Sequence, residues 1–232
     1  MIDLHCHILP GVDDGPQELE ESLAMARLAA RDGIRTIVAT PHLPPPAFAD
    51  HPWIEEQVAR LNAALQEEGL PVQVLAGAEV PAVPEVLEHL AELPRLGGGA
   101  YVLLEPPLMG FPNYLEEVVF GMQLAGVRVA LAHPERTALI RVRPEVFERL
   151  AQRECVMQMN VESVTGRAGW ATRRLALGLL RDSPQCVVAT DAHDAVRRPP
   201  LLSPLARALR KKGGEARFRE LTEEQPGGIL GG

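Results

Sequence analysis

The chain has few aromatic residues, only three cysteines and no long apolar run. Phe, Trp and Tyr make up 4% of the 232 residues, so the core has to be built from aliphatic side chains. Three cysteines without a C-x-x-C spacing argue against a disulfide framework and fit a reducing compartment. No stretch approaches the roughly 18 apolar residues of a transmembrane helix, and residues 1–30 lack the basic and apolar segments of a signal peptide. We therefore expect a cytoplasmic protein without membrane insertion.

Positive charge is also scarce. The chain has 23 Lys and Arg against 31 Asp and Glu, which gives a formal net charge of −8. An acidic chain is a poor match for nucleic acid or an anionic membrane, although a local pair of arginines can still bind an anionic substrate. Hydrophobic residues make up 46% of the chain, enough for a sizeable core.

Short apolar runs alternate with longer runs that have the period of a helix. We predict seven strands, at residues 2–6, 36–39, 73–76, 101–104, 128–132, 155–160 and 186–189. We predict seven helices, at residues 17–31, 52–68, 84–91, 113–125, 144–152, 170–181 and 202–212. This alternation is typical of an α/β fold whose parallel strands are joined by right-handed crossovers.

Closed into a ring, the seven units form a distorted TIM-like (β/α)7 barrel, one unit short of the eight-fold barrel. An open doubly wound sheet is the alternative, but it usually carries a glycine-rich phosphate loop after its first strand. Here the first strand ends in His-Cys-His. We expect one domain over residues 1–232, with a loose glycine-rich tail from about residue 222.

Side chains that can bind metals recur where the predicted strands end. The candidates are His5, His7, His42, Glu79, Glu105, His133, Asp191 and His193. The carboxyl ends of barrel strands meet at one rim, so these groups should converge although the sequence separates them. A single histidine at such a place would more often be structural, but five of the seven histidines lie at predicted strand ends.

The spacing of the first two histidines predicts a shared cavity. In a strand, residues two apart point the same way, so His5 and His7 face one side and Cys6 faces the other. Asp191 and His193 repeat this spacing. Imidazole with carboxylate suits Zn, Mn or Fe better than Ca, and there are enough groups for two or three ions. Glu79 is the natural bridge, because metals about 3.5–4 Å apart can clamp both oxygens of an in-line displacement.

Three arginines lie close to these groups. Arg136 follows His133 by three residues, and Arg197 and Arg198 follow His193. A guanidinium fork binds phosphate oxygens in a bidentate manner, which makes Arg136 and one of the adjacent pair candidates for a phosphate site. Only one of Arg197 and Arg198 should face the site, because neighbouring residues tend to point apart.

The remaining histidines and the cysteines are expected to lie outside the site. His51 belongs to a proline-rich loop, and His89 to a predicted helix. Cys6, Cys155 and Cys186 lie within strand runs, where free cysteine usually acts as a small buried residue. We therefore do not expect a cysteine nucleophile.

Taken together, the motifs resemble the PHP (polymerase and histidinol phosphatase) superfamily. Within it, they are most similar to the bacterial metal-dependent protein-tyrosine phosphatases of capsule and exopolysaccharide synthesis. The likeness runs in one order from residue 3 to residue 194, through DLHCHILPGVDDGP, ESLAMARLAARDGIRTIVATPH, GAEV, LLEPP, LAHPER, MQMNVESVTGRAG and ATDAHD. One departure is the run of prolines after ATPH, which would border the mouth of the site.

The resemblance implies a trinuclear centre and assigns roles by motif position. The implied metal ligands are His5, His7, Asp14, His42, Glu79, Glu105, His133, Asp191 and His193. Asp14 enters only through the resemblance, since the residues alone suggest a turn there, and Asp13 has no assigned role. Arg136 and Arg198 would hold the substrate phosphate, and His42 and Asp14 are candidates for assisting the leaving oxygen. Manganese is the usual ion of the family, with Fe, Zn and Mg as alternatives.

The expected activity is hydrolysis of phosphotyrosine on a protein, with a bacterial tyrosine autokinase that regulates polysaccharide synthesis as the expected partner. One alternative is histidinol-phosphate phosphatase, which the LPGVDDG continuation disfavours. The other is a non-catalytic metal-binding regulator, which would have no use for Arg136 and Arg198. Association into a homo-oligomer stays open.

Overall fold

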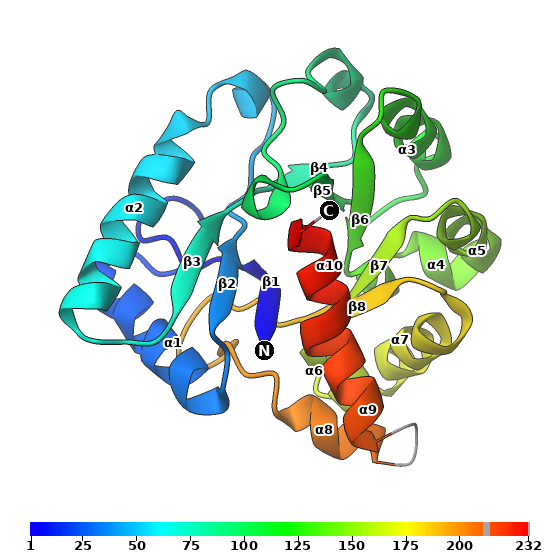
Figure 1. The fold of residues 1–232 in the computed structure, drawn as a ribbon. Helices are drawn as coiled ribbons and strands as arrows, with labels where there is room; N and C mark the ends of the chain where they lie inside the picture. Colours follow the sequence, from blue (N-terminus) through cyan, green and yellow to red (C-terminus); the bar gives the residue numbers. More distant parts are fainter. Residues whose placement is uncertain (211–213, 232) are drawn as a thin grey trace.

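The computed structural model describes residues 1–210 and 214–231 and contains two parallel sheets. The first sheet consists of β1 (Ile2–Cys6), β2 (Thr36–Ala39) and β3 (Gln73–Ala76). The second consists of β4 (Glu79–Pro81), β5 (Tyr101–Glu105), β6 (Arg128–Ala132), β7 (Val156–Asn160) and β8 (Cys186–Ala189). Single bridges, Cys6–Ala192 and His42–Glu79, link the two sheets. The strands stand in a ring with helices around it (Figure 1), as expected for a distorted barrel, but the ring is not one continuous sheet.

The described residues contain eight strands where the sequence predicted seven. The chain turns after β3, so Glu79 follows that strand, as predicted, and also begins the additional short strand β4. Gly77 lies in this turn, and a Cβ there would lie 2.8 Å from Cγ1 of Val38. Glycine therefore permits the close approach at the turn between the predicted strand and the additional one.

The helices surround the strands. They are α1 (Leu19–Asp32), α2 (Pro52–Glu67), α3 (Leu115–Leu124), α4 (Leu139–Val142), α5 (Pro144–Gln152), α6 (Val161–Thr165), α7 (Trp170–Asp182), α8 (Pro204–Leu209), α9 (Gly214–Arg219) and α10 (Gln225–Gly231). The helix predicted over 84–91 is instead a 3-10 helix at Pro84–Glu88, and Pro94 disfavours helical backbone just beyond it. The helix predicted over 202–212 is shorter, as α8, and residues 211 and 212 lie outside the described part of the chain.

Alternate strand residues build two apolar layers. Leu103 and Ala130 belong to a cluster inside the ring, whereas Val102, Leu104 and Leu131 belong to a larger cluster that includes the surrounding helices. The period of two along each strand therefore separates an inner from an outer core.

The segment after residue 222 is not the loose tail that its composition predicted. It forms α10, in which Ile229 is 3% exposed and joins the inner cluster. The glycines of the facing turn allow close packing, since a Cβ at Gly97 would lie 2.8 Å from Cδ2 of Leu230. Figure 1 shows α10 crossing in front of the ring, close to the start of β1. The segment covers one end of the barrel because its few apolar side chains complete the inner core.

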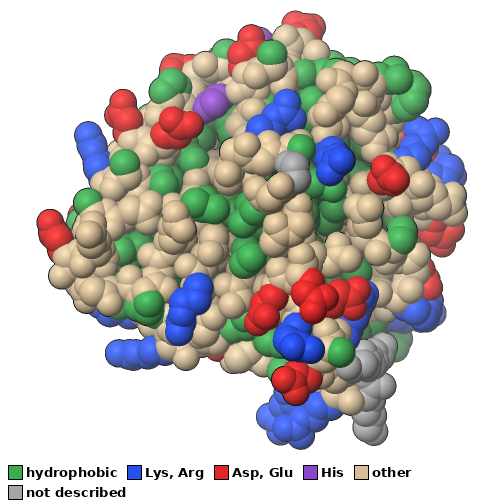
Figure 2. Space-filling model, viewed as in Figure 1, with side chains coloured by type: hydrophobic (Ala, Val, Ile, Leu, Met, Phe, Trp, Pro, Cys, Tyr) green, Lys and Arg blue, Asp and Glu red, His purple; other side chains and the backbone are tan. Residues whose placement is uncertain are grey.

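On the face that α10 crosses, charged side chains of both signs are interspersed around hydrophobic ones (Figure 2). Histidine shows only near the upper edge of this face. Within the described residues, no helix is both long and apolar enough to cross a membrane.

Candidate metal centre

The structure brings the nine candidate ligands together at the carboxyl ends of the strands. They form four overlapping groups, in each of which the potential ligand atoms lie within 4.8 Å of one another. The groups are His7, Asp14, His42 and His193; His5, Glu79 and His133; His5, His7 and Asp191; and His42, Glu79 and Glu105. Because several residues belong to two groups, the arrangement can serve more than one ion.

Glu79 lies at the centre of this cluster and is 1% exposed. Its Oε1 lies 2.9 Å from Nε2 of His133. Its Oε2 lies 3.1 Å from Nδ1 of His42, 3.3 Å from Nε2 of His7 and 3.4 Å from Nε2 of His5. The two carboxylate oxygens therefore face different groups of imidazoles, which is the geometry that a bridging carboxylate requires.

An extra residue in β1 helps to place the two histidines. Asp3 pairs with Ile37 and Cys6 with Ala39, so three steps along β1 match two steps along β2. Leu4 therefore faces the inner cluster while Cys6, two residues later, faces the outer one. As predicted, His5 and His7 meet and Cys6 lies on the opposite side.

Hydrogen bonds define which nitrogen of each of these rings faces the cluster. His5 Nδ1 lies 2.8 Å from Oε1 of Gln158, and His7 Nδ1 lies 2.7 Å from Oδ2 of Asp13. Both partners are acceptors, so each ring donates from Nδ1. The two Nε2 atoms then face each other at 3.3 Å. Two lone pairs at this distance repel unless positive charge lies between them, and the donor set therefore fits a divalent cation.

The carboxylates of the cluster hold positive charge on the imidazoles. Burial alone would lower the pKa of His5, but Glu79 and Asp191 raise it to about 10. The hydrogen bond to Glu79 likewise raises the pKa of His42 to about 9, against the effect of burial. His193 shows the opposite, because burial and the nearby His7 lower its pKa to about 4. The cluster therefore attracts cations, and protons compete with metal ions for it.

Two arginines converge on one oxygen of Asp191. Nη1 of Arg136 lies 2.8 Å from Oδ2 of Asp191, and Nη2 of Arg198 lies 2.6 Å from the same atom. Their side chains remain about one-third exposed, at 35% and 32%. Arg197 is exposed, so one member of the adjacent pair faces the site, as predicted.

Sequence reasoning missed the residues that hold the candidate ligands in place. Asp13 contacts His7, and Gln158 and Asn160 of β7 contact His5 and Asp191. A signal for the pair on β7 was present, because the polar residues in the run VMQMN are two apart, as in His-x-His. Asp13 had no such signal, since the loop that carries it has no repeating period.

The residues predicted to lie outside the site do so. Nε2 of His51 lies 2.5 Å from the backbone oxygen of Glu92, and His89 packs beside Phe48. All three cysteines are buried, and burial raises the pKa of the Cys6 thiol well above its usual range. A buried neutral thiol is a poor nucleophile, which agrees with the prediction.

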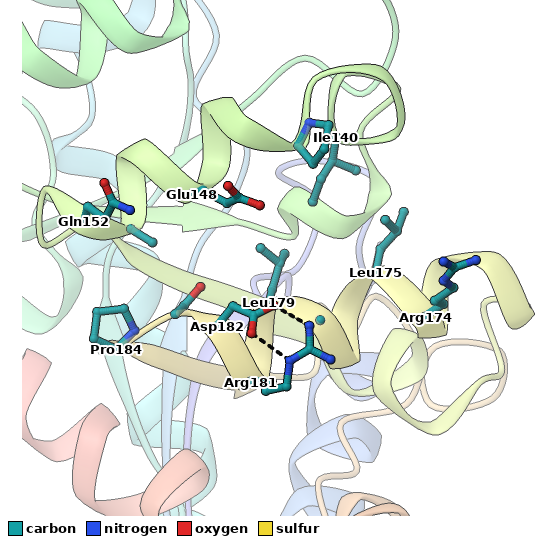
Figure 3. A pocket seen from close by; sticks show the side chains of 13 residues that line it. Ile140, Glu148, Gln152, Arg174, Leu175, Leu179, Arg181, Asp182 and Pro184 are labelled. Atoms are coloured by element: carbon teal, nitrogen blue, oxygen red, sulfur yellow. Dashed lines mark hydrogen bonds and ion pairs between the residues drawn. The ribbon is translucent and has the colours of Figure 1, made fainter.

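A separate groove runs between α5 and α7 (Figure 3). Glu148 and Gln152 line one side, and Arg174 and Leu179 line the other. None of the nine candidate ligands and neither Arg136 nor Arg198 lines this groove. It is therefore distinct from the metal cluster.

Comparisons with known proteins agree with this geometry. A family model described as "Capsular polysaccharide synthesis, CpsB/CapC" matches residues 1–231. The tyrosine-protein phosphatase YwqE of Bacillus subtilis (strain 168) is 37% identical over 201 residues, which cover 85% of this chain and 79% of the relative. The tyrosine-protein phosphatase CpsB of Streptococcus pneumoniae is 28% identical over 239 residues, which cover 99% and 98%.

Solved structures give the same result at the level of the fold. A chain from the crystal structures of YwqE and CpsB, described there as unique metal-dependent tyrosine phosphatases, superposes with a TM-score of 0.91 at 35% identity. The superposition covers 99% of this chain and 94% of that one. Histidinol phosphate phosphatase from Lactococcus lactis superposes with a TM-score of 0.57 at 16% identity, over 91% and 94% of the chains, and shares the fold.

Proposed function

Because the chain belongs to the CpsB/CapC family of capsular polysaccharide synthesis, we propose that it is a metal-dependent protein-tyrosine phosphatase. The observation that carries the proposal is the convergence of nine candidate ligands beside two arginines that share one carboxylate. A cation cluster next to paired guanidinium groups suits a phosphate ester, whose oxygens need several positive partners.

We propose that the nine residues hold two or three divalent ions, with manganese as the physiological ion and Fe, Zn or Mg as alternatives. The mixed imidazole and carboxylate donors of the four groups support this assignment. Such ions supply a Lewis acid that activates water for attack on phosphorus.

The chain's own residues position the phosphate. Arg136 comes from the loop after β6 and Arg198 from the loop after β8, so the two guanidinium groups approach Asp191 from different loops. From these positions they would neutralise charge on the phosphate oxygens during attack. His42 and Asp14, whose side chains are 40% and 62% exposed, are the proposed groups nearest the leaving oxygen.

An exposed apolar loop supports a tyrosyl substrate. Met109 and Phe111, which are 82% and 63% exposed, follow the candidate ligand Glu105 in the loop after β5. The backbone N–H of Ala138 donates to the oxygen of Leu108 at 2.9 Å, so this loop runs beside the loop of Arg136. An aromatic ring with an attached phosphate would find apolar contacts there as well as cations.

The proposed partner is a bacterial tyrosine autokinase whose phosphorylated tyrosines are the substrate, and the proposed location is the cytoplasm. The family's link to capsule synthesis supports the kinase. Three free cysteines support a reducing compartment.

The test is hydrolysis of a phosphotyrosine peptide and of p-nitrophenyl phosphate. We expect activity that EDTA removes, that added Mn²⁺ restores, and that Cys6→Ser leaves intact. Activity that depends on Cys6 and ignores chelation would contradict the proposal. Preferential turnover of histidinol phosphate would assign a different substrate, and full metal loading without turnover of any of these esters would indicate a regulator.

A further inference from the structure

The end of β7 contributes none of the candidate ligands, yet its two amide side chains lie within the cluster. Gln158 and Asn160 are 0% and 4% exposed. We propose that they are positioning residues, which fix the tautomer of His5 and the orientation of Asp191 and so raise the affinity for the ion between these two. The inference rests on the proposed metal centre. It adds two residues that are not ligands themselves but influence how tightly one ion binds.

A continuous line of hydrogen bonds joins the two candidate ligands through β7. Nδ1 of His5 lies 2.8 Å from Oε1 of Gln158, and Nε2 of Gln158 donates to Oδ1 of Asn160 at 3.0 Å. Nδ2 of Asn160 then donates to Oδ2 of Asp191 at 2.5 Å. A ligand from β1 and one from the end of β8 are thereby both tied to β7.

The chemistry of the last acceptor fixes the direction of the whole line. An ionised carboxylate only accepts, so Asn160 has to present its NH2 group to Asp191. Its oxygen then faces the NH2 group of Gln158, whose own oxygen faces His5. His5 must therefore carry its proton on Nδ1 when it binds a metal, which leaves Nε2 as the ligand atom. The same line holds Oδ2 of Asp191, so Oδ1 faces the ring nitrogens of His5 and His7 at 3.6 and 3.7 Å.

The backbone keeps the two amides in place. Oε1 of Gln158 also accepts from the backbone N–H of His133 at 3.3 Å, and the backbone N–H of Asn160 donates to Oε1 of Glu135 at 3.0 Å. Between them, Met159 packs on the outer side of the strand and is fully buried. Gln158 and Asn160 are thus held rigidly, as residues that orient metal ligands need to be.

The experiment measures Mn²⁺ binding to the full chain by calorimetry for wild type, Gln158→Leu and Asn160→Leu. We expect one class of ion to bind about 10- to 100-fold more weakly in each variant, while the remaining ions bind as before. Asn62→Leu is the matched control, because the amide of Asn62 bonds to the backbone of Val74 in β3 and to no candidate ligand among the described residues. It should lower stability and leave the Mn²⁺ affinity unchanged.

A second measurement reads the tautomer directly. In the Zn²⁺-loaded wild type, histidine ¹⁵N chemical shifts should show His5 protonated at Nδ1, and Gln158→Glu, which retains the acceptor, should keep that signature. Protonation at Nε2 in the wild type, or wild-type affinity in folded Gln158→Leu, would overturn the inference. Should Gln158→Leu not fold, the wild-type spectrum still decides. A wild type that binds neither Mn²⁺ nor Zn²⁺ would instead refute the proposed metal centre.

Discussion

Oδ2 of Asp13 lies 2.7 Å from Nδ1 of His7, so this carboxylate orients one of the two central imidazoles. Burial opposes ionisation of Asp13, but the hydrogen bond from His7 lowers its pKa below the usual value. Its two oxygens also accept from the backbone N–H groups of Gly15 at 2.9 Å and His42 at 3.2 Å. Asp13 therefore connects the loop after β1 with two candidate ligands.

Replacement of Asp13 by Ala should weaken Mn²⁺ binding by about 10- to 100-fold, because His7 loses the acceptor that fixes its tautomer. Equilibrium dialysis against Mn²⁺ measures the effect. Asp182→Ala is the control, since Asp182 pairs with Arg181 on the outside of α7. Equal Mn²⁺ affinities for wild type and Asp13→Ala would show that Asp13 stabilises the loop after β1 without influencing metal binding.

Arg136 and Arg198 should each be needed for turnover. Replacing either by Lys keeps the charge but removes the fork, and we expect kcat for p-nitrophenyl phosphate to fall by about 10²- to 10³-fold. Arg197→Lys is the matched control, because its side chain is exposed beside Arg198. If kcat falls in Arg197→Lys and not in Arg198→Lys, then Arg197 binds the phosphate and the assignment of Arg198 is wrong.

Metal affinity should rise with pH. Without metal, carboxylates raise the pKa of His5 to about 10 and that of His42 to about 9, so both rings are protonated at neutral pH. An ion that binds to either ring has to displace a proton, and affinity should increase by up to about tenfold per pH unit for each proton released. Calorimetry in two buffers of different ionisation enthalpy counts these protons between about pH 6 and pH 8. Affinity that is independent of pH would contradict this linkage.

Eight of the nine candidate ligands could be found from the sequence because two simple regularities place them, whereas Asp14 was found only through the family resemblance. Parallel strands bring their carboxyl ends together, and residues two apart on a strand share a face, as with His5 and His7. Arg198 could be separated from Arg197 only through the family resemblance. The additional strand β4 could not be predicted, because the turn before it depends on the close approach of Gly77 to Val38 of β2.

The residues that hold the candidate ligands were harder to find, and the reasons differ. The extra residue in β1 changes which side chains face inward after Leu4, and no local sequence pattern predicts it. Asp13 reaches His7 by a loop geometry that only the folded chain defines. Gln158 and Asn160 obey the same period of two as the histidines, so their position was predictable, but their partners on β1 and after β8 were not.

The helix at the carboxyl end should contribute to stability without affecting the metal centre. Ile229 of α10 is 3% exposed and packs in the inner core with Leu4 and Val38, at the end of the ring away from the cluster. Ile229→Ala removes buried methyl groups and should lower the free energy of unfolding by about 2–5 kcal/mol, measured by urea denaturation at a fixed Mn²⁺ concentration. Leu124→Ala is the control, because Leu124 is 73% exposed and its loss should change stability by less than about 0.5 kcal/mol. Ile229→Ala should bind Mn²⁺ like the wild type. If Ile229→Ala is instead as stable as the control variant, the segment after residue 222 does not contribute to the core and is the loose tail that its glycines suggested.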